Sequence, residues 1–337
     1  MLADDGAEPR ILRFAAGDES LRPWLAGFLE PEGIDVDSYV AGVRPAAAAW
    51  RVVGGGEQLG QELFAAEALV VETTPVDSAL LAAAPRLRRI VHFGSGLEGI
   101  DLEACAARGI GAVAFDRLTT AHVAEHALTL LLLLLRRMDE SRVRARASRE
   151  PAGAPAEPRN TFNWQAVHGI RTLAGLRVGV VGMGDIGAAF ARRARCLGAQ
   201  VAYWSRRPRP ALEAALDMRR LELADLADWA DAVSIHIAAV PELHSLIGAE
   251  FLDQLGADGI LINTSRGQLV DSQALAEALR SDRLAAAAVD VLTTEPPDSG
   301  EPLLTAPRLV MTAHVGAGER AVVLADVEAV LRVLEAS

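Results

Sequence analysis

Three side chains with the chemistry for a carbonyl reduction stand at the ends of predicted strands in the second half of the chain. Arg266, Glu295 and His314 each follow shortly after a short apolar run. A guanidinium group binds a carboxylate through parallel hydrogen bonds and polarises the carbonyl beside it. An imidazole held by a carboxylate can deliver a proton to the carbonyl oxygen as a hydride arrives. Together the three residues predict the reduction of a 2-oxo acid, although each alone also has an ordinary structural explanation.

A glycine-rich segment upstream predicts where the hydride donor binds. Gly182-Met183-Gly184-Asp185-Ile186-Gly187 follows the apolar run 177–181 and opens a predicted helix at 185–197. In this context the glycines allow a tight turn and let backbone amides approach a pyrophosphate at the positive end of the helix. A βα turn that binds nothing is the structural alternative. The order of this motif and the three later side chains favours a dinucleotide site.

The residues that end the next predicted strand bear on the choice of cofactor. Ser205-Arg206-Arg207 follows the run 200–204. An acidic residue here would bind the ribose hydroxyls of NAD and repel an additional phosphate. A hydroxyl and two guanidinium groups instead suit the 2′-phosphate of NADP. Arginines that simply point into solvent are the alternative, and the pattern favours NADP(H) over NAD(H).

The elements that must position these residues form two series of alternating strands and helices. Such alternation predicts doubly wound parallel sheets, and hence an α/β fold with two lobes. A long apolar helix at 119–138 separates the two series. In the first series we expect strands at 11–14, 68–71, 90–93 and 111–114 and helices at 79–84 and 101–108. In the second we expect strands at 178–181, 200–204, 232–236, 259–263, 286–290 and 309–312 and helices at 185–197 and 272–279.

The composition excludes several other classes of protein. The 337 residues include 33 basic and 45 acidic side chains, and every basic one is Arg. The net charge of −12 argues against a nucleic-acid partner, and the lack of Lys excludes Schiff-base, P-loop and kinase chemistry. Cys105 and Cys196 form no metal-binding or disulfide pattern. The acidic N-terminus is unlike a signal peptide, and the apolar run 127–135 is far shorter than the roughly twenty residues that span a bilayer. We therefore expect a cytoplasmic protein with no metal and no membrane contact.

With these motifs the chain resembles the D-isomer-specific 2-hydroxyacid dehydrogenase family from about residue 70 to residue 316. Besides the glycine-rich turn, the segments that match the family pattern are 93–101, 124–126, 263–267, 289–296 and 312–316. The resemblance implies a Rossmann dinucleotide-binding domain at 117–316 and a flavodoxin-like substrate-binding domain made of 1–116 and 317–337. It also implies a homodimer and a small 2-oxo or 2-hydroxy acid as the substrate.

The resemblance further assigns individual residues to the site. Arg266, Glu295 and His314 are implied as the catalytic residues. Ser95, Gly96 and Leu97, with Arg266, are implied to bind the substrate. The implied cofactor-binding residues are Gly182, Met183, Gly184, Asp185, Ile186, Gly187, Ser205, Arg206, Arg207, His236, Ala238, Thr264, Ser265, Asp290 and Gly316. The chain departs from the family pattern at Ala238 and Ala313, where the family usually has proline.

The function expected from these features is the reversible, NADPH-dependent reduction of a small 2-oxo acid to a D-2-hydroxy acid, with His314 as the proton donor. The Ser-Arg-Arg segment is similar to that of the NADPH-using glyoxylate and hydroxypyruvate reductases. Two alternatives belong to different classes. A catalytically silent, dinucleotide-sensing protein like the corepressors of this fold would keep the same residues. His122-Val-Ala-Glu125-His126 also matches the HxxEH signature of zinc peptidases.

Overall fold

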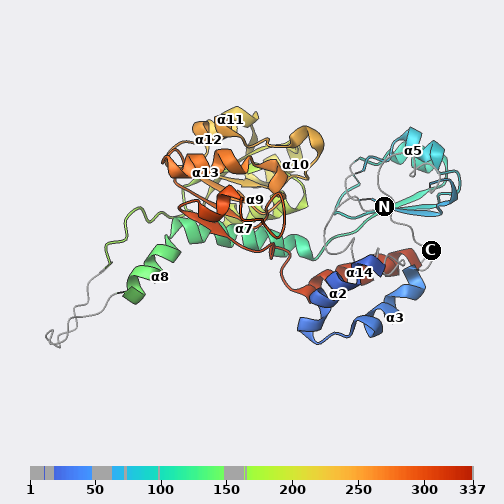
Figure 1. The fold of residues 1–337 in the computed structure, drawn as a ribbon. Coiled ribbons are helices and arrows are strands. Elements are labelled where there is room, and N and C mark those ends of the chain that lie inside the picture. Colours follow the sequence, from blue (N-terminus) through green and yellow to red (C-terminus); the bar gives the residue numbers. More distant parts are fainter. Residues whose placement is uncertain are drawn as a thin grey trace. The chain divides into compact units, whose positions relative to one another are not determined.

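The chain divides into two compact units, each with its own parallel sheet (Figure 1). The first unit comprises Met1–His122 and Ala317–Ser337, and the second comprises Val123–Gly316. The computed structural model describes residue 11 and residues 19–47, 63–71, 74–97, 99–147, 163 and 165–335.

The second unit is built on a seven-stranded sheet in which every pairing is parallel. The order is β10-β9-β8-β7-β4-β5-β6, so β4 and β7 are neighbours although two strands separate them in the chain. The winding reverses between these two strands, and ligands of such sheets bind at the carboxyl ends of the strands beside that reversal. The strands are β4 (Arg177–Val181), β5 (Gln200–Trp204), β6 (Arg219–Arg220), β7 (Ala232–Ile235), β8 (Ile260–Asn263), β9 (Ala286–Val289) and β10 (Leu309–Met311).

Helices cover both faces of this sheet because its strands are apolar on both sides. Val178 and Val180 of β4 belong to one buried cluster with α7 and α9. Val181 and Val233 belong to the cluster that contains α11, α12 and α13. The helices are α7 (Thr119–Leu135), α8 (Met138–Ala147), α9 (Asp185–Cys196), α10 (Pro210–Leu216), α11 (Leu223–Trp229), α12 (Ala249–Leu255) and α13 (Ser272–Arg280).

The described part of the first unit contains a smaller sheet with the order β1-β2-β3, again parallel. Val70 and Val91 pack on one face with α2, α3 and α14. Leu69 and Ile90 pack on the other face with α5 and α6. The elements are α2 (Arg22–Leu29), α3 (Val36–Ala47), β1 (Ala68–Val71), α5 (Ser78–Ala83), β2 (Arg89–His92), α6 (Leu102–Ala107), β3 (Gly111–Ala114) and α14 (Arg320–Glu335).

The predicted α/β class with parallel sheets is confirmed, and the structure differs from the predicted elements most clearly at the end of α7. The helix predicted at 119–138 ends at Leu135, where the apolar run gives way to two arginines. Arg137 adopts a left-handed conformation with φ of 52°, which stops the helix before α8 begins. Of the strand predicted at 11–14, residues 12–14 lie outside the described residues, and Ile11 is helical. None of the described helices is long and apolar enough to cross a membrane.

A buried carboxylate from α14 satisfies the backbone at the start of α7. Asp326 is fully buried and accepts hydrogen bonds from the amides of Leu118 and Thr119 at 2.8 and 3.2 Å. It also accepts a bond of 3.0 Å from the Thr119 hydroxyl. The first amides of a helix have no partner within the helix, so this side chain fixes the point at which α7 begins.

We expect Asp326→Ala to lower the free energy of unfolding by about 2–4 kcal/mol, because it leaves two backbone amides and a hydroxyl without an acceptor. Urea denaturation followed by circular dichroism measures the change. Asp228→Ala, at an exposed position of α11, is the matched control and should change the free energy by less than about 0.5 kcal/mol. Equal effects of the two substitutions would contradict the capping role.

Candidate active site

The glycine-rich turn after β4 lies against the end of β7. The Gly182 amide donates to the Trp204 carbonyl at 2.8 Å, and its φ is 103°. A Cβ at Gly182 would lie 2.4 Å from the His236 carbonyl oxygen, and a Cβ at Gly187 would lie 2.0 Å from the Gly182 carbonyl oxygen. A Cβ on Gly184, by contrast, would have no atom within 4 Å. The turn is thus tight where the chain passes itself and open at the start of α9, which fits a dinucleotide pyrophosphate.

His236 follows β7 at the winding reversal and is held as a neutral imidazole. Its Nε2 is 2.9 Å from the Ser234 hydroxyl oxygen, and its ring centroid is 4.9 Å from that of Phe190. Desolvation by the surrounding protein lowers the pKa of His236 to about 3. The ring therefore carries no charge beside the glycine-rich turn at neutral pH.

The loop after β5 contains three arginines, and the Ser205-Arg206-Arg207 motif includes only two of them. Arg206 and Arg207 are exposed, and Ser205 donates its hydroxyl proton to the Arg207 carbonyl. Arg209 donates from Nε to the Met183 carbonyl within the glycine-rich turn at 3.0 Å. Arg209 could have been found in the sequence, because it is the second arginine of Arg207-Pro-Arg209-Pro and stands directly before α10.

Arg266 lies in the loop after β8, whose backbone is fixed by a buried asparagine. Asn263 accepts from the Ser265 amide at 3.0 Å and donates to the Arg266 carbonyl at 2.9 Å. Gly267 follows, and a Cβ there would lie 2.0 Å from the Leu292 carbonyl carbon. Glycine at this position therefore lets the loop that carries Arg266 pass directly against the loop that carries Glu295.

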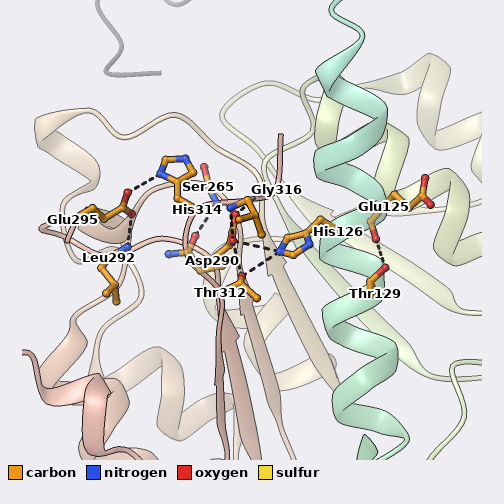
Figure 2. Close-up of polar contacts among 12 residues, drawn as sticks. Glu125, His126, Thr129, Ser265, Asp290, Leu292, Glu295, Thr312, His314 and Gly316 are labelled. Atoms are coloured by element: carbon orange, nitrogen blue, oxygen red, sulfur yellow. Dashed lines mark hydrogen bonds and ion pairs between the residues drawn. The ribbon is translucent and has the colours of Figure 1, made fainter. Parts of the chain in front are cut away.

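Glu295 and His314 form a pair beyond the neighbouring strands β9 and β10 (Figure 2). The Glu295 carboxylate accepts from the Leu292 amide at 2.8 Å and lies 2.7 Å from Nδ1 of His314. Because a carboxylate only accepts, Nδ1 carries the proton of this bond and Nε2 is left for exchange with another molecule. The Glu295 and His314 side chains are 35% and 43% exposed, so solutes can reach the pair.

The loop that carries His314 is fixed by Asp290, which is 2% exposed. The backbone carbonyl of Asp290 accepts from the His314 amide at 2.8 Å. Its carboxylate accepts from the amides of Val315 and Gly316 at 2.9 and 2.8 Å and from the Thr312 hydroxyl at 2.5 Å. His314 has a φ of 53°, a left-handed conformation that is unfavourable for a residue with a Cβ. The bonds to Asp290 hold this conformation in place.

His126 of α7 completes the surroundings of the carboxylate (Figure 2), and the predicted site did not include it. Its Nε2 is 3.2 Å from Oγ1 of Thr312 and 3.4 Å from Oδ1 of Asp290. Burial raises the pKa of Asp290, but hydrogen bonds from His126, Thr312 and the Val315 amide outweigh burial and hold this pKa below its ordinary value. The carboxylate is therefore ionised at neutral pH.

The remaining predicted cofactor residues lie along the same edge of the sheet. Thr264 is buried, and its Oγ1 has no hydrogen-bond partner among the described residues, which fits a polar ligand at this position. Ser265 donates its hydroxyl proton to the Ile237 carbonyl and so ties the loops after β8 and β7 together. Ala238 is exposed in the second of these loops.

The predicted substrate loop belongs to the first unit. Its chain leaves β2 at Phe93, whose amide donates to the Val71 carbonyl at 2.7 Å. Ser95 is exposed, while Gly96 and Leu97 are half-buried. Glu98 of this loop lies outside the described residues.

The two histidines of the HxxEH pattern have different surroundings. His126 contacts Thr312 and Asp290, as described. The ring of His122 lies against Gly318, where a Cβ would come within 2.3 Å of Nδ1. Within the described residues no three His, Cys, Asp or Glu side chains are grouped so that they could hold a metal ion. The helix that carries the pattern packs in the core through its leucines.

A Rossmann sheet with a carboxylate–imidazole pair at its carboxyl edge is an arrangement that suits a dinucleotide-dependent oxidoreductase. The sequence profile of the D-isomer specific 2-hydroxyacid dehydrogenase NAD binding domain matches residues 128–316. The chain is 35% identical over 242 residues to a glyoxylate reductase of Korarchaeum cryptofilum, an alignment that covers 72% of this chain and 70% of that protein. The chain belongs to the D-isomer-specific 2-hydroxyacid dehydrogenase family.

Two further relatives show how widely the similarity extends. The chain is 37% identical over 253 residues to a D-3-phosphoglycerate dehydrogenase of Mycobacterium leprae, covering 75% of this chain. It spans about half of that longer enzyme, since the alignment covers 45% of it. A crystal structure of the NADPH-dependent glyoxylate/hydroxypyruvate reductase from Sinorhizobium meliloti, in complex with NADP and malonate, is similar with a TM-score of 0.56. The identity there is 30%, and the match covers 80% of each chain.

The low pKa of His236 predicts a specific loss of stability in acid. An unfolded histidine takes up its proton near pH 6.5, whereas folded His236 does so near pH 3. Between these values protonation favours the unfolded chain, by up to about 1.4 kcal/mol per pH unit. We expect His236→Gln to remove this contribution, so that the free energy of unfolding falls less steeply from pH 6.5 toward pH 4. Urea titrations across this range measure both slopes, and identical slopes would show that folded His236 titrates normally.

Proposed function

We propose that the protein reduces a small 2-oxo acid to the D-2-hydroxy acid with NADPH, reversibly, and that His314 is the proton donor. The observation that carries the proposal is the 2.7 Å contact between Glu295 and Nδ1 of His314. This contact directs the other ring nitrogen away from the carboxylate, where it can meet a substrate oxygen. A nicotinamide cofactor supplies the hydride when it is bound.

In this scheme Arg266 binds the substrate, and the pair of His314 and Glu295 transfers the proton. Arg266 binds the carboxylate of the substrate and polarises its carbonyl, as a planar guanidinium does in other carboxylate sites. His314 gives the proton from Nε2 to the carbonyl oxygen, and Glu295 stabilises the imidazolium that must be present before this transfer. In the oxidation of a 2-hydroxy acid the same imidazole accepts the proton. We propose that the first unit contributes Ser95, Gly96 and Leu97 to substrate binding.

The preference for NADPH rests on the charge of the loop after β5. Arg206 and Arg207 are exposed beside Ser205, and Arg209 adds a third guanidinium that is anchored to the glycine-rich turn. Ser205, rather than an acidic residue, directly follows β5 in the chain, at the position where NAD enzymes hold the ribose hydroxyls with a carboxylate. The reductase from Sinorhizobium meliloti, which is NADPH-dependent, supports the same choice.

A cytoplasmic location and homodimer formation complete the proposal. The resemblance implies a dimer through the long helix. Met138 and Val143 of α8, the helix that follows it, expose 52% and 61% of their surface and are available to a second copy of the chain.

We expect His314→Asn to lower kcat for reduction by about 100-fold or more, because the proton donor is lost. Asparagine tolerates the left-handed conformation at this position, so the loop should keep its shape. Initial rates of NADPH oxidation at 340 nm with glyoxylate, hydroxypyruvate, pyruvate and phenylpyruvate measure the change, and fluorescence titration measures NADPH binding. His244→Asn, at an exposed histidine, is the control.

The two measurements together separate the possible outcomes. Loss of turnover with NADPH binding unchanged supports the assignment. Full activity of His314→Asn refutes the role of His314. If the unaltered protein binds NADPH and reduces none of the acids, the enzymatic proposal fails and the dinucleotide-sensing alternative takes its place.

We expect the double substitution Ser205→Asp with Arg206→Ala to lower the ratio of kcat/KM for NADPH to that for NADH by at least about ten-fold. The new carboxylate repels the 2′-phosphate and binds the ribose hydroxyls, and one guanidinium partner is removed. Arg192→Ala, at an exposed position of α9, removes one arginine charge away from this loop and should leave the ratio unchanged. An unchanged ratio in the double variant would mean that this loop does not select the cofactor.

A further inference from the structure

His126 stands outside the pair that handles the proton, yet it contacts the residues that hold that pair. It lies on α7, whereas Thr312 and Asp290 follow β10 and β9 (Figure 2). Its side chain is 18% exposed and that of Asp290 is 1% exposed. A polar group at so sheltered a position needs partners, and those of His126 are the Thr312 hydroxyl and the Asp290 carboxylate.

The direction of each hydrogen bond in this group follows from counting protons. Thr312 has one hydroxyl proton, and the Asp290 carboxylate receives it at 2.5 Å. Thr312 can therefore only accept from His126, which fixes the proton of the imidazole on Nε2. Nε2 also lies 3.4 Å from Oδ1 of Asp290. This contact likewise requires a proton on Nε2, because an ionised carboxylate cannot donate one. His126 is thus the donor at the head of a chain that runs through Thr312 to Asp290.

The chain of bonds ends on the backbone that carries His314. The carbonyl and carboxylate of Asp290 receive the amides of three consecutive residues, His314, Val315 and Gly316. A Cβ at Gly316 would lie 2.8 Å from Oδ2 of Asp290 and 3.5 Å from Cδ2 of His126, so the loop sits directly against both side chains. The Asp290 carboxylate therefore holds the two residues that directly follow His314, and the Asp290 backbone carbonyl holds His314 itself.

We propose that His126 is a positioning residue, which acts through Thr312 and Asp290 to hold the strained His314 loop in its reactive geometry. This inference rests on the proposed function, since it assigns a supporting role for the same proton donor. Loss of the Nε2 proton leaves the Thr312 hydroxyl oxygen without its donor and removes one of the three donors around Oδ1 of Asp290, where the Thr312 hydroxyl and the Val315 amide remain. Asp290 can then rotate, and a small displacement of His314 is enough to lower the rate of proton and hydride transfer.

The test uses two substitutions that separate hydrogen bonding from packing. His126→Phe keeps a planar ring of similar size and removes the donor, whereas His126→Gln keeps an amide nitrogen where Nε2 was. We expect kcat to fall by about 10- to 100-fold in His126→Phe and by less than about three-fold in His126→Gln. The dissociation constant of NADPH should change by less than about three-fold in both. Glu125→Gln, at the exposed neighbouring position on α7, is the control and should match the unaltered protein.

A kinetic isotope effect distinguishes positioning from simple loss of structure. With NADPH deuterated at the transferred position, slower chemistry in His126→Phe should raise the primary isotope effect on kcat. Partial unfolding would lower the amount of active protein and leave that effect unchanged. Thr312→Val removes the middle of the chain and should reproduce both results. Combined with His126→Phe it should cause little further loss, because the two residues act through the same carboxylate.

The outcomes also separate this inference from the proposed function. If His314→Asn is inactive and His126→Phe keeps both its kcat and its isotope effect, the positioning role is refuted while the proposed function stands. If His126→Gln loses as much activity as His126→Phe, packing rather than hydrogen bonding is responsible and the inference fails. Should His126→Phe not fold, the same two measurements on Thr312→Val decide the question.

Discussion

The buried carboxylate of Asp290 is the contact on which the geometry of this site depends. It directly follows β9, the strand beside the edge strand β10, and it is hydrogen-bonded to two backbone amides, a hydroxyl and an imidazole instead of to water. An ionised group in such surroundings stabilises the fold only while these donors remain in place. The loop beyond β10 supplies most of them, and it therefore keeps a left-handed residue that it would otherwise avoid.

The order of the strands explains why residues far apart in the chain can form one site. β8, β9 and β10 lie side by side and point the same way, so the loops that follow them carry Arg266, Glu295 and His314 to one edge. Gly267 lets two of these loops touch. The winding reverses between β4 and β7, and the glycine-rich turn follows β4 on the same edge of the sheet.

Much of this arrangement could be predicted because the relevant signals are local. Apolar runs bounded by turns indicated six strands of the second unit to within about a residue, and the glycine spacing indicated the turn after β4. The strand β6 was missed because its two residues are both arginines. The contact between His126 and Asp290 could not be predicted, because it joins residues 164 positions apart whose orientation depends on packing. The break at Arg137 was missed for a related reason: nothing in the residue itself favours a left-handed backbone.

The loop beyond β10 is held through its backbone, while the imidazole of His314 takes no part in holding it. Among the described residues its side-chain partner is Glu295, whereas Asp290 accepts hydrogen bonds from the amides of this loop. In the proposed function, the imidazole of His314 performs the chemistry, whereas the backbone of the same segment is what Asp290 holds. A single substitution at His314 would then remove the proton donor and leave the backbone bonds to Asp290 in place. Descendants of such a protein have a short evolutionary route from catalyst to nucleotide sensor.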